Sequence, residues 1–265
     1  MKVKHKVAIV TGGGTGIGRA TALLLAEEGA YVAVVGRRES KLLETVNDIR
    51  EHGGSAHHIP GDISNVCETE RIVKEAVEQF GGLDILVNNA GVYRSPKITE
   101  TTEDDYDYVM DINLKGTFFM CKHAVSEMRK RGSGPIINVG SALGIQGWKD
   151  ASTSIYSASK GGVVMLTKVM ALELAKDQIR VNCVCPAIVE TEVFETLGIP
   201  KDKIPERLKQ WSSFHPLGRN GQPEEVAKAV LYFASDDSSW ATGSVFNLDG
   251  GVTAAQVIHT RWQPD

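Results

Sequence analysis

The chain has 265 residues, of which 42% are hydrophobic, and its formal net charge is -4. This length suits a single α/β domain with a sizeable buried core. The slight acidity gives no reason to expect nucleic acid or an anionic membrane as a partner. No apolar stretch reaches the roughly 20 residues of a membrane span. The first strand-like run begins at Val7, which leaves no room for a signal peptide, so we expect a cytoplasmic protein.

The first strand-like run is followed by an alternation of apolar segments and amphipathic segments. The expected strands are Val7–Thr11, Tyr31–Val35, Ala56–Pro60, Leu83–Val87, Pro135–Val139, Arg180–Val184 and Val245–Leu248. The expected helices are Arg19–Glu28, Ser40–His52, Asn65–Phe80, Thr102–Arg131, Tyr156–Ala175 and Glu224–Ala234. This order predicts an α/β fold in which a doubly wound, Rossmann-like parallel sheet carries helices on both faces. We expect one domain over residues 1–265, with its ligands at the carboxyl ends of the strands.

The first strand runs directly into the sequence Thr-Gly-Gly-Gly-Thr-Gly-Ile-Gly, and a helix follows. Glycine lets the backbone approach a pyrophosphate, and the helix N-terminus offers amides and a positive dipole end to that anion. A purely structural turn needs fewer glycines. We therefore interpret this segment as a dinucleotide site. The cofactor contacts expected there are Gly12, Thr15, Gly16, Ile17 and Gly18.

The second strand ends in Gly36-Arg37-Arg38. An acidic residue about 20 residues beyond the glycines binds the ribose hydroxyls of NAD. Two guanidinium groups suit the 2′-phosphate of NADP instead. NADP is the preferred prediction. NAD remains open, because one or both arginines also fit as solvated residues at a helix start.

Tyr156 and Lys160 lie four residues apart on an expected helix and therefore share one face of it. A phenol with a pKa near ~10 is a poor acid or base at neutral pH. A neighbouring ammonium group favours the phenolate and lowers that pKa. The spacing alone is common on helix surfaces, so the remaining motifs decide its meaning.

Several motifs occur in a fixed order: the turn of Thr11–Gly18, Asn88-Asn89-Ala90-Gly91, Asn113 within Asp111–Gly116, Ser141, Tyr156-x-x-x-Lys160, and Pro186 to Thr191. In this order the chain resembles the short-chain dehydrogenase/reductase family, in its single-domain branch, over nearly its whole length. The resemblance implies an NAD(P)-dependent oxidoreductase. Such an enzyme moves hydride between a nicotinamide and the carbon of a carbonyl or secondary alcohol.

The resemblance also assigns roles to individual residues. Tyr156 is the expected general acid/base, and Lys160 lowers its pKa and binds the nicotinamide ribose. Ser141 positions the substrate oxygen, and Asn113 holds a water in a proton relay with the lysine. Further cofactor contacts implied by the resemblance are Asp62, Ile63, Asn89, Ala90, Gly91, Pro186, Ile188 and Thr191. No group of histidines and carboxylates shows ligand spacing, so we predict no metal site.

Two departures from the family pattern lie near the substrate. Ala187 follows Pro186 where the family usually has glycine, and the separation of Ser141 from Tyr156 is longer than usual. The extra residues belong to Gly147–Ser154, where we interpret Ser152, Thr153 and Ser154 as loop-formers rather than catalytic hydroxyls.

The least regular stretch spans residues 190–221 and is a candidate substrate lid. Its apolar residues are Val193, Phe194, Leu197, Trp211 and Phe214. Trp148, Trp211 and Phe214 fit two interpretations equally well, either lining a substrate pocket or packing the lid. The lid composition favours an apolar small-molecule substrate.

The four cysteines are Cys67, Cys121, Cys183 and Cys185, which we interpret as reduced thiols. Cys183 and Cys185 fall in one strand-like run, and we expect their side chains on opposite faces of that strand.

The reaction class leaves several functions open. A ketone or 3-oxoacyl reductase, or an alcohol dehydrogenase, is the preferred prediction. The alternative is a non-catalytic sensor that binds NADP, against which the intact catalytic set argues. Related enoyl reductases usually space tyrosine and lysine more widely, and sugar-nucleotide epimerases usually carry a larger C-terminal domain. The resemblance also implies a homotetramer. Substrate identity and direction of turnover do not follow from the sequence.

Overall fold

The structure is a computed structural model that describes residues 1–149, 151–192 and 200–254. Seven strands form one sheet in the order β3-β2-β1-β4-β5-β6-β7, and all neighbouring pairs are parallel. The strands are β1 (Val7–Thr11), β2 (Tyr31–Gly36), β3 (Ser55–Pro60), β4 (Ile85–Asn88), β5 (Gly134–Val139), β6 (Ile179–Pro186) and β7 (Val245–Leu248). The predicted doubly wound parallel sheet is therefore confirmed. The strand order reverses between β1 and β4, which is where sheets of this kind bind ligands.

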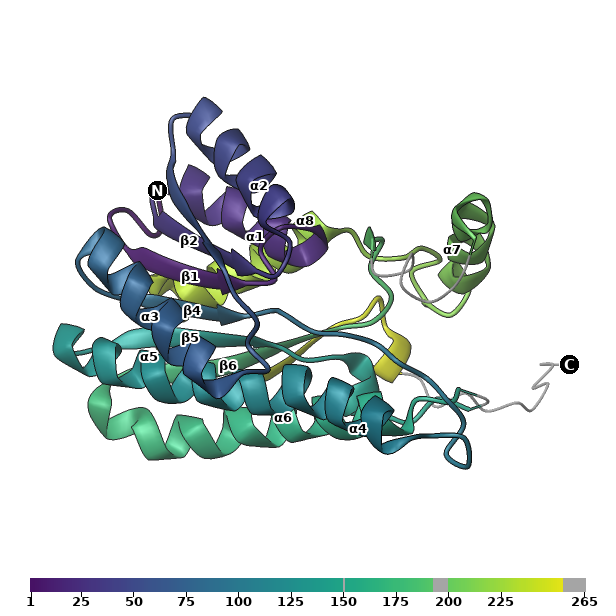
Figure 1. Cartoon of the computed structure of the whole chain (residues 1–265). Coiled ribbons are helices and arrows are strands. Elements are labelled where there is room, and N and C mark those ends of the chain that lie inside the picture. The colour runs from purple at the N-terminus through teal and green to yellow at the C-terminus, as the bar shows by residue number, and fades with distance from the viewer. Residues whose placement is uncertain (150, 193–199, 255–265) are drawn as a thin grey trace, which may run out of the picture.

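Two layers of helices cover the sheet (Figure 1). One layer consists of α1 (Gly16–Glu27), α2 (Glu39–Glu51) and α8 (Pro223–Ala234). The other contains α3 (Val66–Phe80), α5 (Thr117–Arg131) and α6 (Ser154–Leu174). Because both faces are covered, every residue of β1 is buried, which explains its uninterrupted apolar run. Each fully buried leucine or isoleucine in these layers contributes about 1.5–3 kcal/mol of transfer free energy.

The expected helix Thr102–Arg131 is present as a continuous helical rod with an irregular centre. Its first part is α4 (Glu103–Met110), which begins with a capping box formed by Thr102 and Asp105. The centre, Asp111–Gly116, is a π-helical turn that carries Asn113. Such turns insert an extra residue into a helix and are frequent at functional sites.

The expectation for Cys183 and Cys185 was wrong. Their sulfur atoms lie 3.5 Å apart on one face of β6. Side chains in a strand alternate between faces, so residues two apart share a face. The two buried thiols lie beneath Gly140, where an added Cβ atom would approach each sulfur to 2.7 Å.

The predicted lid segment is described over residues 190–192 and 200–221. It contains α7 (Ile204–Ser212), which stands apart from the helical layers in Figure 1. Gly221 forms an isolated parallel bridge with Val189, three residues beyond the end of β6. Three of the apolar lid residues, Val193, Phe194 and Leu197, lie outside the described residues. Within the described ranges, no helix is long and apolar enough to cross a membrane.

Candidate active site

A cavity of about 1760 Å³ runs along the carboxyl ends of the strands. Arg37 and Arg38, which follow β2, line one part of it. Ser141, Tyr156 and Lys160, which pack around the end of β5, line another. The sheet order places β1 and β4 between these groups, so one cavity joins the glycine turn to the predicted catalytic residues.

The glycine turn fits a pyrophosphate. Gly12 and Gly16 have φ angles of 66° and 52°, a region that favours glycine. A Cβ atom on Gly12 would lie 2.8 Å from the side-chain nitrogen Nδ2 of Asn89. Thr15, the N-cap of α1, makes no side-chain hydrogen bond to the helix amides, and the first turn contains no acidic residue. The amides and the positive dipole end of α1 can therefore receive an anion from the cavity.

Gly18 lies outside the cavity wall, although it was expected to contact the cofactor. A Cβ atom on Gly18 would lie 2.2 Å from the carbonyl oxygen of Gly12. The structure therefore gives Gly18 a packing role, since it lets α1 approach the turn closely. The other predicted residues of the turn, Gly12, Thr15, Gly16 and Ile17, line the cavity.

Three positively charged side chains, those of Arg37, Arg38 and Lys41, lie after the end of β2 in the cavity wall. Arg38 Nη2 donates a hydrogen bond to Thr15 Oγ1 at 3.2 Å, and Arg37 Nη1 lies 3.9 Å from Asp62 Oδ2. Lys41, which the sequence reasoning missed, also lines the cavity here. Lys41 Nζ lies 2.7 Å from a Glu44 carboxylate oxygen, and Arg37 lies beside Asp62, whereas Arg38 donates to a hydroxyl group. Arg38 is therefore the cation at this end of the cavity that is best suited to receive an anionic group.

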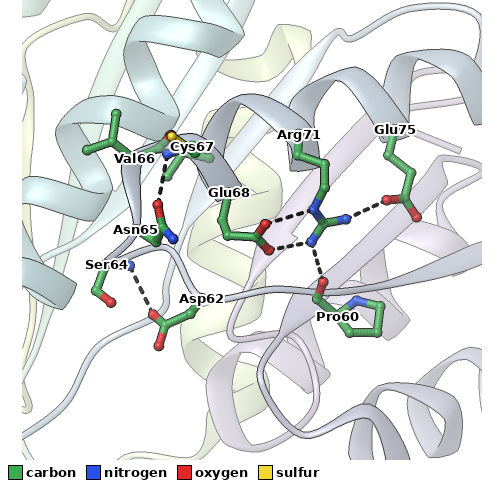
Figure 2. Close-up of polar contacts among 10 residues, drawn as sticks. Pro60, Asp62, Ser64, Asn65, Val66, Cys67, Glu68, Arg71 and Glu75 are labelled. Atoms are coloured by element: carbon green, nitrogen blue, oxygen red, sulfur yellow. Dashed lines mark hydrogen bonds and ion pairs between the residues drawn. The ribbon is translucent and has the colours of Figure 1, made fainter.

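The loop after β3 is held by Arg71 (Figure 2). The Arg71 guanidinium donates to the carbonyl oxygen of Pro60 at 2.6 Å and pairs with Glu68 and Glu75. One carboxylate oxygen of Asp62 accepts a hydrogen bond from the backbone amide of Ser64 at 2.9 Å. These contacts fix the direction of the Asp62 side chain, and both Asp62 and Ile63 line the cavity as predicted.

The loop after β4 passes between the turn and the catalytic residues. Asn89 Nδ2 donates to the carbonyl oxygen of Thr11 at 2.9 Å, which ties this loop to the turn. An added Cβ on Gly91 would lie 3.3 Å from Asn113 Oδ1 and 3.4 Å from Lys160 Nζ. Asn89, Ala90 and Gly91 all line the cavity, as do Pro186, Ile188 and Thr191.

Helix α6 places Tyr156 and Lys160 on one face. Lys160 is 5% exposed, and its Nζ donates to the carbonyl oxygen of Val139 at 2.8 Å. The same nitrogen lies 5.9 Å from the centre of the Tyr156 ring. The Thr153 hydroxyl oxygen accepts a hydrogen bond from Ser157 at 3.1 Å at the start of α6, which agrees with a loop-forming role for Thr153.

Burial shifts the pKa values of both Tyr156 and Lys160. Burial raises the pKa of Tyr156 to about 12, and a hydrogen bond with Ser141 offsets part of that shift. Burial also lowers the pKa of Lys160, while the neighbouring Cys183 and Cys185 act in the opposite direction. The pKa of Tyr156 is therefore raised, and not lowered as expected from Lys160. At this pKa the phenol is protonated in the neutral range.

Ser141 follows β5 and begins a short 3-10 turn, Ala142–Gly144. Its hydroxyl oxygen accepts a hydrogen bond from the backbone amide of Leu143 at 3.1 Å. The hydroxyl hydrogen is therefore directed to another acceptor, such as the Tyr156 oxygen or a substrate oxygen.

Asn113 lies behind the cavity wall and is 1% exposed. Its side-chain nitrogen donates to the carbonyl oxygen of Val92 at 2.9 Å and to Ser159 Oγ at 3.1 Å. Its side-chain oxygen accepts from the backbone amide of Val92 at 2.8 Å. The Asn113 side chain therefore braces the loop after β4.

Several lining residues escaped the sequence reasoning. The most informative is Tyr93, whose ring meets the Tyr156 ring edge-on with centroids 4.8 Å apart. Its position two residues after Gly91, in a loop at a strand's carboxyl end, was a usable signal. Trp148, Trp211 and Phe214 all line the cavity, which favours the pocket interpretation of these three aromatic residues.

Comparison with known proteins agrees with this geometry. Residues 12–253 match the family model described as enoyl-(acyl carrier protein) reductase. A 3-oxoacyl-[acyl-carrier-protein] reductase of Thermotoga maritima is 40% identical over 95% of this chain and 99% of its own length. A glucose and ribitol dehydrogenase homolog of Oryza sativa subsp. japonica is 42% identical over 95% of this chain and 87% of its own. A short-chain type dehydrogenase/reductase from Mycobacterium marinum superposes with a TM-score of 0.90, at 36% identity over 96% of this chain and 98% of its own.

A parallel sheet whose glycine turn shares one cavity with a half-buried tyrosine and a buried lysine defines a nicotinamide-dependent oxidoreductase. The chain belongs to the short-chain dehydrogenase/reductase family. The prediction of an NAD(P)-dependent oxidoreductase that acts on a small molecule is confirmed at this level.

Proposed function

We propose that the protein interconverts a ketone and a secondary alcohol, with Tyr156 as the general acid/base. The observation that carries this proposal is the half-buried Tyr156 phenol, which is hydrogen-bonded with Ser141 and lies in the same cavity as the glycine turn. A bound nicotinamide supplies or accepts the hydride. The carbonyl oxygen accepts hydrogen bonds from Ser141 and Tyr156. As negative charge develops on that oxygen, the phenol proton moves to it.

The residues around Tyr156 support both directions of this proton transfer. The Ser141 hydroxyl donates to the oxygen that holds the charge. A Lys160 ammonium group, with its nitrogen 5.9 Å from the centre of the Tyr156 ring, would stabilise the phenolate left on Tyr156. The Val139 carbonyl fixes Lys160 Nζ at 2.8 Å. Asn113 acts in this proposal by holding the loop that carries Gly91 and Tyr93, and its place in a proton relay belongs to the same proposal.

NADP is the proposed cofactor. The support is the group of Arg37, Arg38 and Lys41 in the cavity wall where the second strand ends. Guanidinium groups bind phosphate through charge-assisted hydrogen bonds. The cofactor contacts named above form the rest of this proposed site, with Gly18 as a packing residue.

The relatives do not define the substrate. One is named for a 3-oxoacyl thioester and another for glucose and ribitol, although their identities to this chain are similar.

A panel of ketones, alcohols, a 3-oxoacyl thioester and an enoyl thioester, followed at the nicotinamide absorbance, tests the proposal. Turnover of ketones or secondary alcohols supports it. Turnover of the enoyl thioester alone overturns it, and binding of NADPH without any turnover favours the sensor.

The single domain, the lid and the homotetramer are also part of this proposal. On α6, Met165, Val169 and Leu172 are 57%, 52% and 82% exposed, and Phe118 on α5 is 48% exposed. Apolar side chains at this helical spacing form a stripe that a partner helix can cover. Light scattering at the mass of four chains supports the tetramer. A cytoplasmic location is the matching cellular proposal, and cell fractionation tests it.

A further inference from the structure

Two pairs of aromatic rings line the cavity. Tyr93 comes from the loop after β4, Trp148 from the loop before α6, and Phe214 from the segment after α7. The Tyr93 and Tyr156 rings meet edge-on at 4.8 Å, and the Trp148 and Phe214 rings lie 6.4 Å apart at an angle of 57°. Three separate elements therefore contribute aromatic rings to the cavity that contains the predicted proton donor.

The same cavity is lined by the apolar residues Leu143, Ala151, Pro216 and Val252. Polar groups in the segment around Trp148 are those of Gln146, Lys149 and Thr153, which also line the cavity. Arg94 also lines the cavity, but it forms an ion pair with Asp105 and lies 4.2 Å above the ring of Tyr108. Its charge is therefore already compensated.

Acidic groups in the described part of the wall belong to the cofactor end. Asp62 lies beside Arg37, and Glu192 acts electrostatically on Lys41. The aromatic rings consequently offer large apolar faces, and the hydrogen-bonding groups beside them include the unpaired Trp148 indole nitrogen. A substrate that places hydroxyl groups against the ring faces would lose hydrogen bonds to water there without recovering them.

Resting on the proposed function, we propose that Trp148 and Phe214 determine specificity by selecting ketones and secondary alcohols whose reacting carbon carries a flat, uncharged ring. The ring lies against Trp148 and Phe214, with Tyr93 on the side of Tyr156, while the oxygen reaches Ser141 and Tyr156. Aromatic rings gain from burial and from offset or edge-on contact with one another. Binding energy from the ring then positions a carbonyl group that offers little binding energy itself.

Steady-state kinetics with acetophenone and butan-2-one test this inference, because the two ketones share a methyl ketone and differ in the ring. With NADPH, wild type should show a kcat/KM for acetophenone at least about tenfold above that for butan-2-one. Trp148→Ala and Phe214→Ala should each reduce this preference about tenfold, mainly through a raised KM for acetophenone. Their kcat/KM values for butan-2-one should fall less than those for acetophenone.

Two variants separate ring recognition from a general loss of structure. Trp148→Phe keeps a ring and should retain most of the preference. Trp240→Ala removes a fully exposed tryptophan away from the cavity wall and should leave the preference unchanged. An active wild type that prefers butan-2-one, or an unchanged preference in Trp148→Ala and Phe214→Ala, overturns the inference. A wild type that reduces neither of these ketones nor any other in the panel overturns the proposed function itself.

Discussion

Arg38 donates a hydrogen bond to Thr15, and this contact joins the end of β2 to the phosphate-binding turn. It holds a guanidinium group at the side of the cavity where the 2′-phosphate of NADP would lie. The proposed preference for NADP therefore depends on the ends of two strands, β1 and β2, that are neighbours in the sheet.

Arg38→Ala should shift the cofactor preference. A charge-assisted hydrogen bond is worth about 1.5–3 kcal/mol, so the ratio of kcat/KM with NADPH to that with NADH should fall roughly tenfold to a hundredfold. The value with NADH should change little. Arg129→Ala is a suitable control, because Arg129 pairs with Asp177 and is not part of the cavity wall. A ratio that is unchanged in Arg38→Ala contradicts the assigned role.

The pH dependence should differ between the two directions of turnover. Ketone reduction needs the protonated phenol. Because burial raises the pKa of Tyr156 to about 12, kcat/KM for the ketone should be flat from about pH 6 to about pH 9. Alcohol oxidation needs the phenolate, so its kcat/KM should rise as the pH rises towards the pKa of the phenol. Both profiles are measured at the nicotinamide absorbance. A reduction rate that falls through a midpoint near neutrality would show that the phenol ionises there.

Gly18→Ala should lower the stability of the fold by disturbing the packing of the glycine turn. Alanine is favoured over glycine in a helix by about 1 kcal/mol. Here, however, the new Cβ atom would lie 2.2 Å from the Gly12 carbonyl oxygen and 2.5 Å from the side-chain nitrogen Nδ2 of Asn89. We expect a lower melting temperature and weaker binding of NADPH.

Gly161→Ala on α6 is the matched control for that substitution. Its new Cβ atom would meet only the Gly144 carbonyl oxygen, at 3.5 Å, so helix propensity should dominate and raise the melting temperature. Both variants are compared by thermal unfolding and by titration with NADPH. Equal changes in the two variants would show that packing around Gly18 is not the cause.

The sheet and the glycine turn could be predicted because their signals are local. Strands buried on both faces appear as continuous apolar runs, and the turn from Gly12 to Gly18 needs glycines that an ordinary turn does not. The π-helical turn around Asn113 could not be predicted, since no residue pattern distinguishes it from the helix on either side. Side chains alternate between the two faces of a strand, so residues two apart, such as Cys183 and Cys185, share a face. The placement of these two cysteines could therefore be predicted from the sequence.

The site residues that belong to a sequence motif could be predicted. The contacts between residues of different loops could not. Tyr156, Lys160 and Ser141 lie together in the cavity wall as expected. The aromatic contact between Tyr93 and Tyr156 depends on how two loops fold back over the rim, which spacing does not encode. Burial likewise determines the pKa of Tyr156, and burial is a property of the assembled fold.

The central claim is that Tyr156 exchanges the proton with the substrate oxygen. Tyr156→Phe keeps the ring, its packing against Tyr93 and the cavity, but removes the hydroxyl group. Steady-state turnover of a ketone with NADPH by this variant, together with a titration of NADPH binding, tests the claim most directly. General acid catalysis contributes about 10²–10⁴-fold, so kcat should fall by at least about a hundredfold while the Kd for NADPH stays within about threefold of wild type. A Tyr156→Phe variant that keeps the wild-type kcat would contradict the mechanism.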